Sequence, residues 1–227
     1  MTTRFPNGVG NVRSDNTLGL MDQPDPTKFH SYENDFDTYS ATDWTVTAVG
    51  TGTSALVAGD GGLLAVTTSA AAPDSRATQL AIASFSFTAG KKMFFKIGCQ
   101  LDNVLLSIFQ AGLIVTDTTP LDATDGIYFQ KAGGTANLDI YVRRDATTGN
   151  RQQLNVAQVQ AGFNSYGWAY DGKTTVTFFV NDRAVGSIQV DSVNSPDTNL
   201  ALSFFIGNNS AVARVLTVDY IFAAKER

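Results

Sequence analysis

The chain has 227 residues, 43% of them hydrophobic, and a formal net charge of −5. This length and apolar content suit one large all-β domain with a real core, and they exclude a chain that is disordered throughout. The 16 Lys and Arg residues are scattered along the sequence. Because phosphate binding requires several positive groups on one face, the charge pattern argues against nucleic acid as a partner.

No apolar run approaches the ~20 residues that a membrane-spanning helix needs. The first ten residues, MTTRFPNGVG, lack the apolar core of a signal peptide. We therefore expect synthesis in a cytoplasm and no membrane partner.

Residues 1–34 are predicted to form an extended N-terminal arm. They contain three prolines and many Asn, Asp and Gly residues, and their apolar side chains follow neither a strand period nor a helix period. Such a segment cannot bury enough surface to fold alone, so its apolar residues need a surface to contact. That surface could belong to its own domain, to a sister subunit or to a different protein. The candidate contact residues are Phe5, Val9, Val12, Leu18, Leu20, Met21 and Phe29.

Residues 35–227 are predicted to form a β-sandwich of the jelly-roll type. Short runs with strand character follow one another, separated by turn residues such as those at 59–62, and no helical stripe interrupts them. This spacing is typical of two packed antiparallel sheets. The predicted strands are 44–49, 54–57, 63–68, 79–87, 92–101, 105–115, 126–131, 138–143, 154–159, 174–180, 184–190, 200–206 and 215–223.

The segment 168–190 has the strongest pattern, a β-hairpin. In its first run, side chains alternate between two faces. Asn181 and Asp182 tolerate the positive φ of a tight turn, and the second run places Ile188 and Val190 on one face. The inward set of the first run is Val176, Phe178 and Val180, and the outward set is Thr175, Thr177 and Phe179.

Cys99 is the only cysteine, so no internal disulfide can form. It belongs to an alternating series on one predicted strand, and we expect a buried core thiol. The series is Met93, Phe95, Ile97, Cys99 and Leu101.

Catalytic residues are not predicted. His30 is the only histidine and lies in the predicted arm, so a Ser-His-Asp or Cys-His relay within the domain cannot be built, nor a His and Cys cluster for zinc. Two of the 21 acidic residues are Glu, and the alternating Glu-x-Asp-x-Glu pattern of glucanases with this architecture is missing. Asp139 and Asp219 lie within strands, where solvated outer positions account for them. We expect no enzyme activity, no cofactor and no metal site.

Two features have a functional interpretation beside a structural one. The loop 117–126 contains Asp117, Asp122 and Asp125, which could hold calcium through carboxylate oxygens, but Asp, Thr, Pro and Gly are also ordinary turn residues. The aromatic residues Tyr166, Trp168 and Tyr170 could form a sugar-stacking platform or pack in the core. We favour the structural interpretation of both.

Three segments carry a resemblance to a known family: DNVLLSIFQAGLIVTDTTPLDATDGIYFQKAGG, then GWAYDGKTTVTFFVND, then LTVDYIFAAKER. With the opening RFPNGVGNV and PDPTKFHSYENDFD, the chain resembles virion structural proteins of tailed bacteriophages that have a concanavalin-like, laminin-G-like jelly roll. The resemblance implies a capsid decoration, or cement, protein on the outer surface of a phage head. It further implies a homo-oligomer, with a trimer favoured, and arms that grip the major capsid protein or neighbouring subunits. No site residue carries over from these structural motifs.

The alternative, from another class, is a carbohydrate-binding lectin-like module of a head or tail fibre. A cement protein needs its arm on capsid subunits or sister copies, whereas a lectin needs a solvent-facing aromatic and polar pocket.

Overall fold

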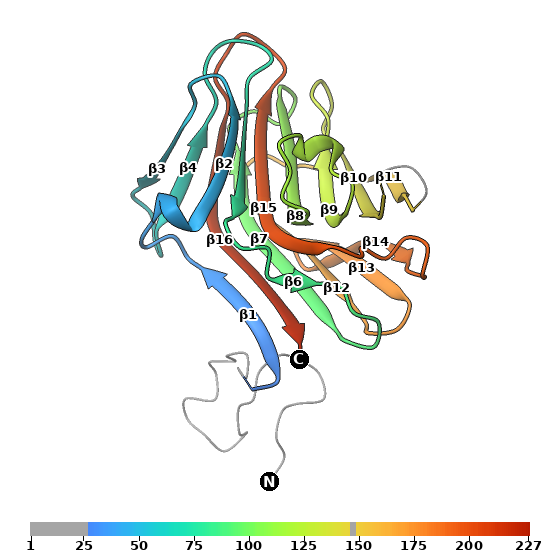
Figure 1. Cartoon of the computed structure of the whole chain (residues 1–227). Coiled ribbons are helices and arrows are strands. Elements are labelled where there is room, and N and C mark those ends of the chain that lie inside the picture. Colours follow the sequence, from blue (N-terminus) through green and yellow to red (C-terminus); the bar gives the residue numbers. More distant parts are fainter. Residues whose placement is uncertain (1–26, 146–148) are drawn as a thin grey trace.

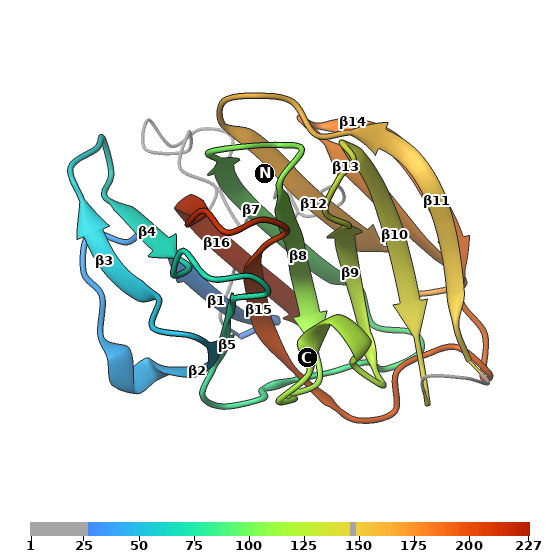
Figure 2. The ribbon, with the colours of Figure 1, turned by 90° about the horizontal axis from the view of Figure 1, so that it is seen from above.

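The computed structural model describes residues 27–145 and 149–227 and shows a two-layer, all-β sandwich (Figure 1). Seen from above, the two sheets lie face to face (Figure 2). All strand pairs are antiparallel. The predicted fold class is therefore confirmed.

The first sheet has the order β14-β13-β12-β7-β16-β4-β3, with β1 also paired to β16. Because β7 and β16 lie at its middle, their outward side chains form the centre of one outer face of the molecule. The strands are β1 (Phe29–Asn34), β3 (Thr53–Val57), β4 (Leu63–Thr67), β7 (Met93–Leu101), β12 (Asn164–Tyr170), β13 (Thr175–Val180), β14 (Arg183–Gln189) and β16 (Val215–Glu226).

The second sheet has the order β11-β10-β9-β8-β15-β5-β2, with β6 also paired to β15. Two 3₁₀ turns, η1 (Ala41–Asp43) and η2 (Pro120–Asp122), lie in the connections. The strands are β2 (Trp44–Val49), β5 (Ser75–Leu80), β6 (Phe85–Ser86), β8 (Ser107–Ile114), β9 (Gly126–Lys131), β10 (Asn137–Arg143), β11 (Arg151–Gln158) and β15 (Asn199–Asn208).

The core lies between the sheets and is built from the inward residues of both. The predicted series on β7 is buried throughout, and Cys99 is 1% exposed. Burial in this apolar layer raises the pKa of the Cys99 thiol. Within the described residues, no helix is long and apolar enough to cross a membrane.

The predicted hairpin is present as β13 and β14. Val176 and Phe178 are fully buried while Thr175 and Thr177 are partly exposed. Asn181 and Asp182 form the turn with φ of 49° and 61°, the left-handed values that Asn and Asp accept more readily than most residues.

Three strand predictions differ from the structure. The run 79–87 is divided: β5 ends at Leu80, a bend leaves Ile82 74% exposed, and β6 begins at Phe85. Strand β12 was not among the predicted strands. Its aromatic residues alternate with small residues, but the Gly and Ser on its outer face weaken the pattern that indicates a strand. Predicted bounds of the other strands shift by a few residues, as expected for strand ends.

The third difference concerns the arm, which we predicted to extend to residue 34. Strand β1 pairs with β16 from Phe29 opposite Glu226 to Asn34 opposite Ile221. Its sequence FHSYEN has few apolar residues, so hydrophobic alternation could not reveal a strand that is held largely by backbone pairing. The part of the predicted arm before Thr27 lies outside the described residues.

Candidate functional site

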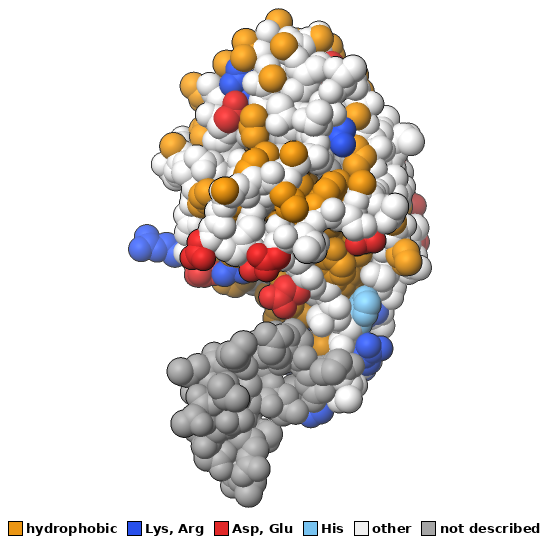
Figure 3. Space-filling model, turned by 90° about the vertical axis from the view of Figure 1, so that its left-hand side faces the viewer, with side chains coloured by type: hydrophobic (Ala, Val, Ile, Leu, Met, Phe, Trp, Pro, Cys, Tyr) orange, Lys and Arg blue, Asp and Glu red, His pale blue; other side chains and the backbone are white. Residues whose placement is uncertain are grey.

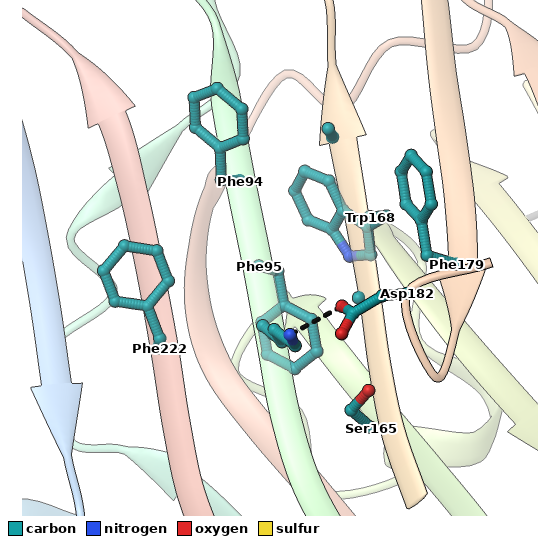
Figure 4. Close-up of a pocket in the computed structure, with 10 residues that line it drawn as sticks. Phe94, Phe95, Ser165, Trp168, Phe179, Asp182 and Phe222 are labelled. Carbon is teal, nitrogen blue, oxygen red and sulfur yellow. Dashed lines mark hydrogen bonds and ion pairs between the residues drawn. The ribbon is translucent and has the colours of Figure 1, made fainter. Parts of the chain in front are cut away.

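An apolar hollow of about 280 Å³ lies on the outer face of the first sheet (Figure 4). Strands β7, β12, β13 and β16 supply its residues. Their phenylalanine side chains on this outer face, unlike the core residues, are partly exposed to solvent. The lining consists of Phe94, Phe95, Lys96, Ser165, Gly167, Trp168, Ala169, Phe179, Asp182 and Phe222.

The sheet register explains why a hollow forms here. Phe222 on β16 pairs with Lys96 on β7, Lys96 pairs with Gly167 on β12, and Gly167 pairs with Phe179 on β13. Phenylalanines thus stand at both ends of this row, and Gly167 within it has no side chain. Ala169, further along β12, is also small. Because Gly167 has no side chain, the floor of the hollow stays open. A Cβ at this position would also come within 3.0 Å of the Phe95 carbonyl oxygen.

The charged residues of the hollow neutralise one another. Lys96 Nζ donates a hydrogen bond to Asp182 Oδ1 at 2.7 Å, the interaction drawn as a dashed line in Figure 4. That hydrogen bond holds the pKa of Lys96 above its usual value. Both side chains are well exposed, at 38% and 78%, so the pair stabilises the fold only slightly.

The hairpin turn that carries Asp182 is fixed to β12. The backbone N–H of Asn181 donates to the Ser165 carbonyl oxygen at 2.8 Å, and Ser165 N–H donates to Asn181 Oδ1 at 2.9 Å. Asn181 Nδ2 also donates to Asn164 Oδ1 at 3.0 Å. The rim of the hollow is therefore held in place by the same residues that form the turn.

The side chains that line this site suit contact with a partner. Its lining contains one amine, one carboxylate and the Ser165 hydroxyl, and no histidine or cysteine. A nucleophile activated by a base, or two carboxylates flanking a sugar, would need other groups. An apolar floor with aromatic walls instead suits the burial of an apolar group from a partner.

The residues considered for catalysis lie elsewhere in the described chain. Asp139 on β10 accepts a hydrogen bond from the Asn155 backbone N–H at 2.7 Å. Asp219 lies at an irregularity of β16, where burial, Asp35 and Asp60 raise its pKa. His30, on β1, has its ring 4.7 Å from that of Phe85.

The aromatic residues weighed as a sugar platform are core residues. Tyr166, Trp168 and Tyr170 are 2%, 2% and 1% exposed, and Trp168 stacks on Phe95 inside the sandwich with centroids 6.0 Å apart. The structural interpretation of these three is confirmed.

The predicted arm contacts divide into two groups. Phe29 is 4% exposed and belongs to β1, so within this chain it is already covered. The other six, Phe5, Val9, Val12, Leu18, Leu20 and Met21, lie outside the described residues.

Sequence reasoning missed the hollow itself. A signal was present for Phe94 and Phe179, which alternate with buried residues and should therefore face outward. Phe222 gave no such signal, because alternation from the buried Leu216 and Val218 points it inward, and only the irregularity of β16 turns it outward. An outward aromatic residue on a central strand is a candidate contact residue. Only the strand order, however, brings these three together.

Apolar residues are also exposed on the side of the molecule that carries β3 (Figure 3). Val49 of β2 and Leu56 and Val57 of β3 are 55%, 45% and 41% exposed.

No protein-family model matches the chain, and no curated protein matches its sequence. Solved structures do match in shape. An endo-1,3-β-glucanase from Streptomyces sioyaensis aligns with a TM-score of 0.62 at 11% identity, over 89% of this chain and 98% of that one. The carbohydrate recognition domain of Emp47p aligns with a TM-score of 0.58 at 10% identity, over 88% and 98%.

A carbohydrate esterase from the Shiga toxin-encoding bacteriophage phi24B also aligns, with a TM-score of 0.51 at 12% identity, over 86% of this chain and 96% of that one. At such identities the likeness concerns the fold alone. The chain therefore has the concanavalin A-like jelly-roll fold shared by lectins and glucanases.

Proposed function

We propose that this chain is a structural virion protein, a capsid decoration or cement protein that binds the outside of a phage head and stabilises the shell. The major capsid protein is its partner, and a trimer is the favoured assembly. The observation that supports the proposal is the apolar hollow on the sheet face, because its partly exposed phenylalanines suit contact with a protein.

The composition of the hollow favours a protein partner. Protein interfaces concentrate their binding energy in aromatic residues around a desolvated centre, with polar groups at the rim. Phe94, Phe179 and Phe222 supply the aromatic side chains, and Lys96, which lies between Phe222 and Gly167 in the register, is neutralised by Asp182 of the hairpin turn. If this chain is a cement protein, an apolar side chain of the capsid protein would insert between these rings.

The test compares substitutions on one face of one strand. Phe179→Ser removes a wall of the hollow, and Thr177→Ser is the matched control, because both side chains are partly exposed on β13. Capsids that lack this component are mixed with each purified variant and sedimented. We expect Phe179→Ser to weaken capsid binding at least tenfold and Thr177→Ser to bind as the wild type does.

Two outcomes oppose this proposal. Unchanged capsid binding by Phe179→Ser would show that the hollow is not the contact site. Failure of the wild-type protein to bind capsids, together with its absence from purified virions by mass spectrometry, would overturn the decoration function.

A second candidate is a carbohydrate-binding, lectin-like module of a head or tail fibre. It is favoured by the fold, which the Emp47p carbohydrate recognition domain shares, and by aromatic rings beside the polar Ser165. Binding of the wild-type protein to a glycan array, lost in Phe179→Ser and without capsid binding, would support it.

A further inference from the structure

Three aspartates from separate loops meet beside the second sheet. Asp125 directly precedes β9, Asp145 follows β10, and Asp197 lies between β14 and β15. One ligand oxygen from each lies within 4.8 Å of those of the other two. Within the described residues, this is the group of acidic side chains that comes together at metal-binding spacing.

Asp125 distinguishes this group from an ordinary acidic surface. Its side chain is 2% exposed, and its buried Oδ1 has no hydrogen-bond partner among the described residues. A buried carboxylate oxygen without a partner is strongly unfavourable. A cation in contact with that oxygen would remove this penalty.

From this geometry we propose that Asp125, Asp145 and Asp197 bind a calcium ion. The site joins the residue before β9, the residues that directly follow β10 and the β14–β15 connection. It is separate from the apolar hollow, and the inference does not depend on the proposed function.

The charges of the group fit a divalent ion. Arg144 Nη2 lies 2.6 Å from Asp197 Oδ2, and Arg144 Nε lies 3.5 Å from Asp145 Oδ2. Three carboxylates and one guanidinium leave a net charge of −2 (−3 + 1) on these residues. Arg144 thus holds two of the loops close together without cancelling the charge that would attract the ion.

The origin of the ligands favours calcium over magnesium. Calcium binds about six to eight oxygen ligands at ~2.3–2.6 Å in flexible geometry, whereas magnesium binds at ~2.0–2.1 Å and needs near-ideal octahedral geometry. Three carboxylates from separate segments of the chain suit the more adaptable ion, with water completing its coordination.

The experiment uses the full chain after treatment with EDTA. Calcium chloride is titrated into it by calorimetry, and thermal unfolding is followed with and without calcium. We expect one binding site and a Tm raised by several degrees, because an ion that binds only the folded state stabilises it. Magnesium chloride at the same concentration should produce a much smaller shift.

Three variants locate the site. Asp125→Asn and Asp197→Asn should bind calcium at least tenfold more weakly. Asp122→Asn is the matched control, because Asp122 lies on the same loop as Asp125 but its side chain is 85% exposed, and it should bind as the wild type does. Asp197 is 44% exposed, so its variant keeps the test valid if Asp125→Asn does not fold.

The proposal is overturned if the wild-type protein shows neither binding heat nor a Tm shift with calcium. It is also overturned if the folded Asp125→Asn and Asp197→Asn variants bind calcium as the wild type does, since the ion would then lie elsewhere. An equal response to magnesium would reject calcium as the specific ion.

Discussion

At the scale of single residues, Lys131 is the most unusual group of the described chain. It is fully buried at the end of β9, and its Nζ donates to the carbonyl oxygens of Ser107 and Ala132. Two carbonyl oxygens do not replace the water that a charged amine loses. Burial therefore lowers the pKa of Lys131 to about 8.

This pKa predicts how stability depends on pH. In the unfolded chain Lys131 keeps its proton up to a pKa of ~10.4, whereas in the folded chain it loses the proton near 8, so this residue makes folding more favourable as pH rises from about 8 to 10. The change is at most about 3 kcal/mol. Urea unfolding of the wild type and of Lys131→Met is measured at pH 7 and pH 10. From pH 7 to pH 10, the unfolding free energy of the wild type should rise relative to that of the variant. A constant difference between the two proteins would contradict this prediction.

Cys99 leads to a second prediction at this scale. Its thiol is buried in the core and its pKa is raised, and the reactive species toward thiol reagents is the thiolate. Ellman's reagent should therefore label the native protein only at the slow rate of unfolding, and within seconds in concentrated denaturant. Fast labelling without denaturant would mean that β7 opens locally.

At the scale of elements, β13 shows how one strand serves both the core and the surface. Phe178 is fully buried and its ring meets that of Phe129 on the other sheet, with centroids 5.2 Å apart. Its neighbours Thr177 and Phe179 are on the opposite face, where Phe179 lines the hollow. A change of register by one residue would exchange these roles.

Aspartate substitutions test this register. Phe178→Asp should abolish folding or cost several kcal/mol of unfolding free energy, because it would bury an unpaired carboxylate and remove a core ring. Thr177→Asp should cost about 0.5 kcal/mol, as is typical of surface changes. Thermal unfolding followed by circular dichroism measures both. Equal losses at the two positions would show that the strand faces are wrongly assigned.

At the scale of the whole molecule, the N-terminal boundary of the sandwich lies earlier in the sequence than we predicted. Strand β1 pairs along its whole length with β16. It also adds the buried Phe29, and Tyr32 packs edge-on against Trp44 with centroids 6.1 Å apart. These contacts make residues 29–34 part of the folded domain.

Two truncations follow from this boundary. Removal of residues 1–26 should leave the Tm within a few degrees of the wild type, since the described sheets and core begin after that segment. Removal of residues 1–34 should lower stability by at least about 2 kcal/mol, the transfer free energy of a side chain such as Phe29. Unfolding of the two chains in urea distinguishes these effects. A large loss of stability after removal of residues 1–26 alone would mean that these residues contribute to the core.

The shorter truncation, compared with the full chain, tests the arm as a capsid contact. If apolar residues such as Phe5 and Leu18 are buried on a partner, each contributes ~1.5–3 kcal/mol, less the cost of ordering the arm. Co-sedimentation of the 27–227 chain with capsids should then be weaker than that of the full chain. Binding of equal strength would place the contact on the sheet face.

The sequence by itself determined the all-β class, the hairpin that forms β13 and β14, and the buried series around Cys99. These features depend on period-2 alternation and on turn residues, which act over a few neighbouring positions. The turn at Asn181 and Asp182 was predictable for the same reason, because the positive φ there is a local property of these two residues.

Only the tertiary structure decided the rest. Strand β1 depends on backbone pairing with β16, almost 200 positions later in the sequence. The hollow depends on strand order, which sets Phe222, Phe94 and Phe179 around a glycine of β12. The three aspartates at 125, 145 and 197 come from loops that are remote in the sequence. Sites of this kind are formed by contacts between distant segments, and a local pattern carries no information about which distant segments will meet.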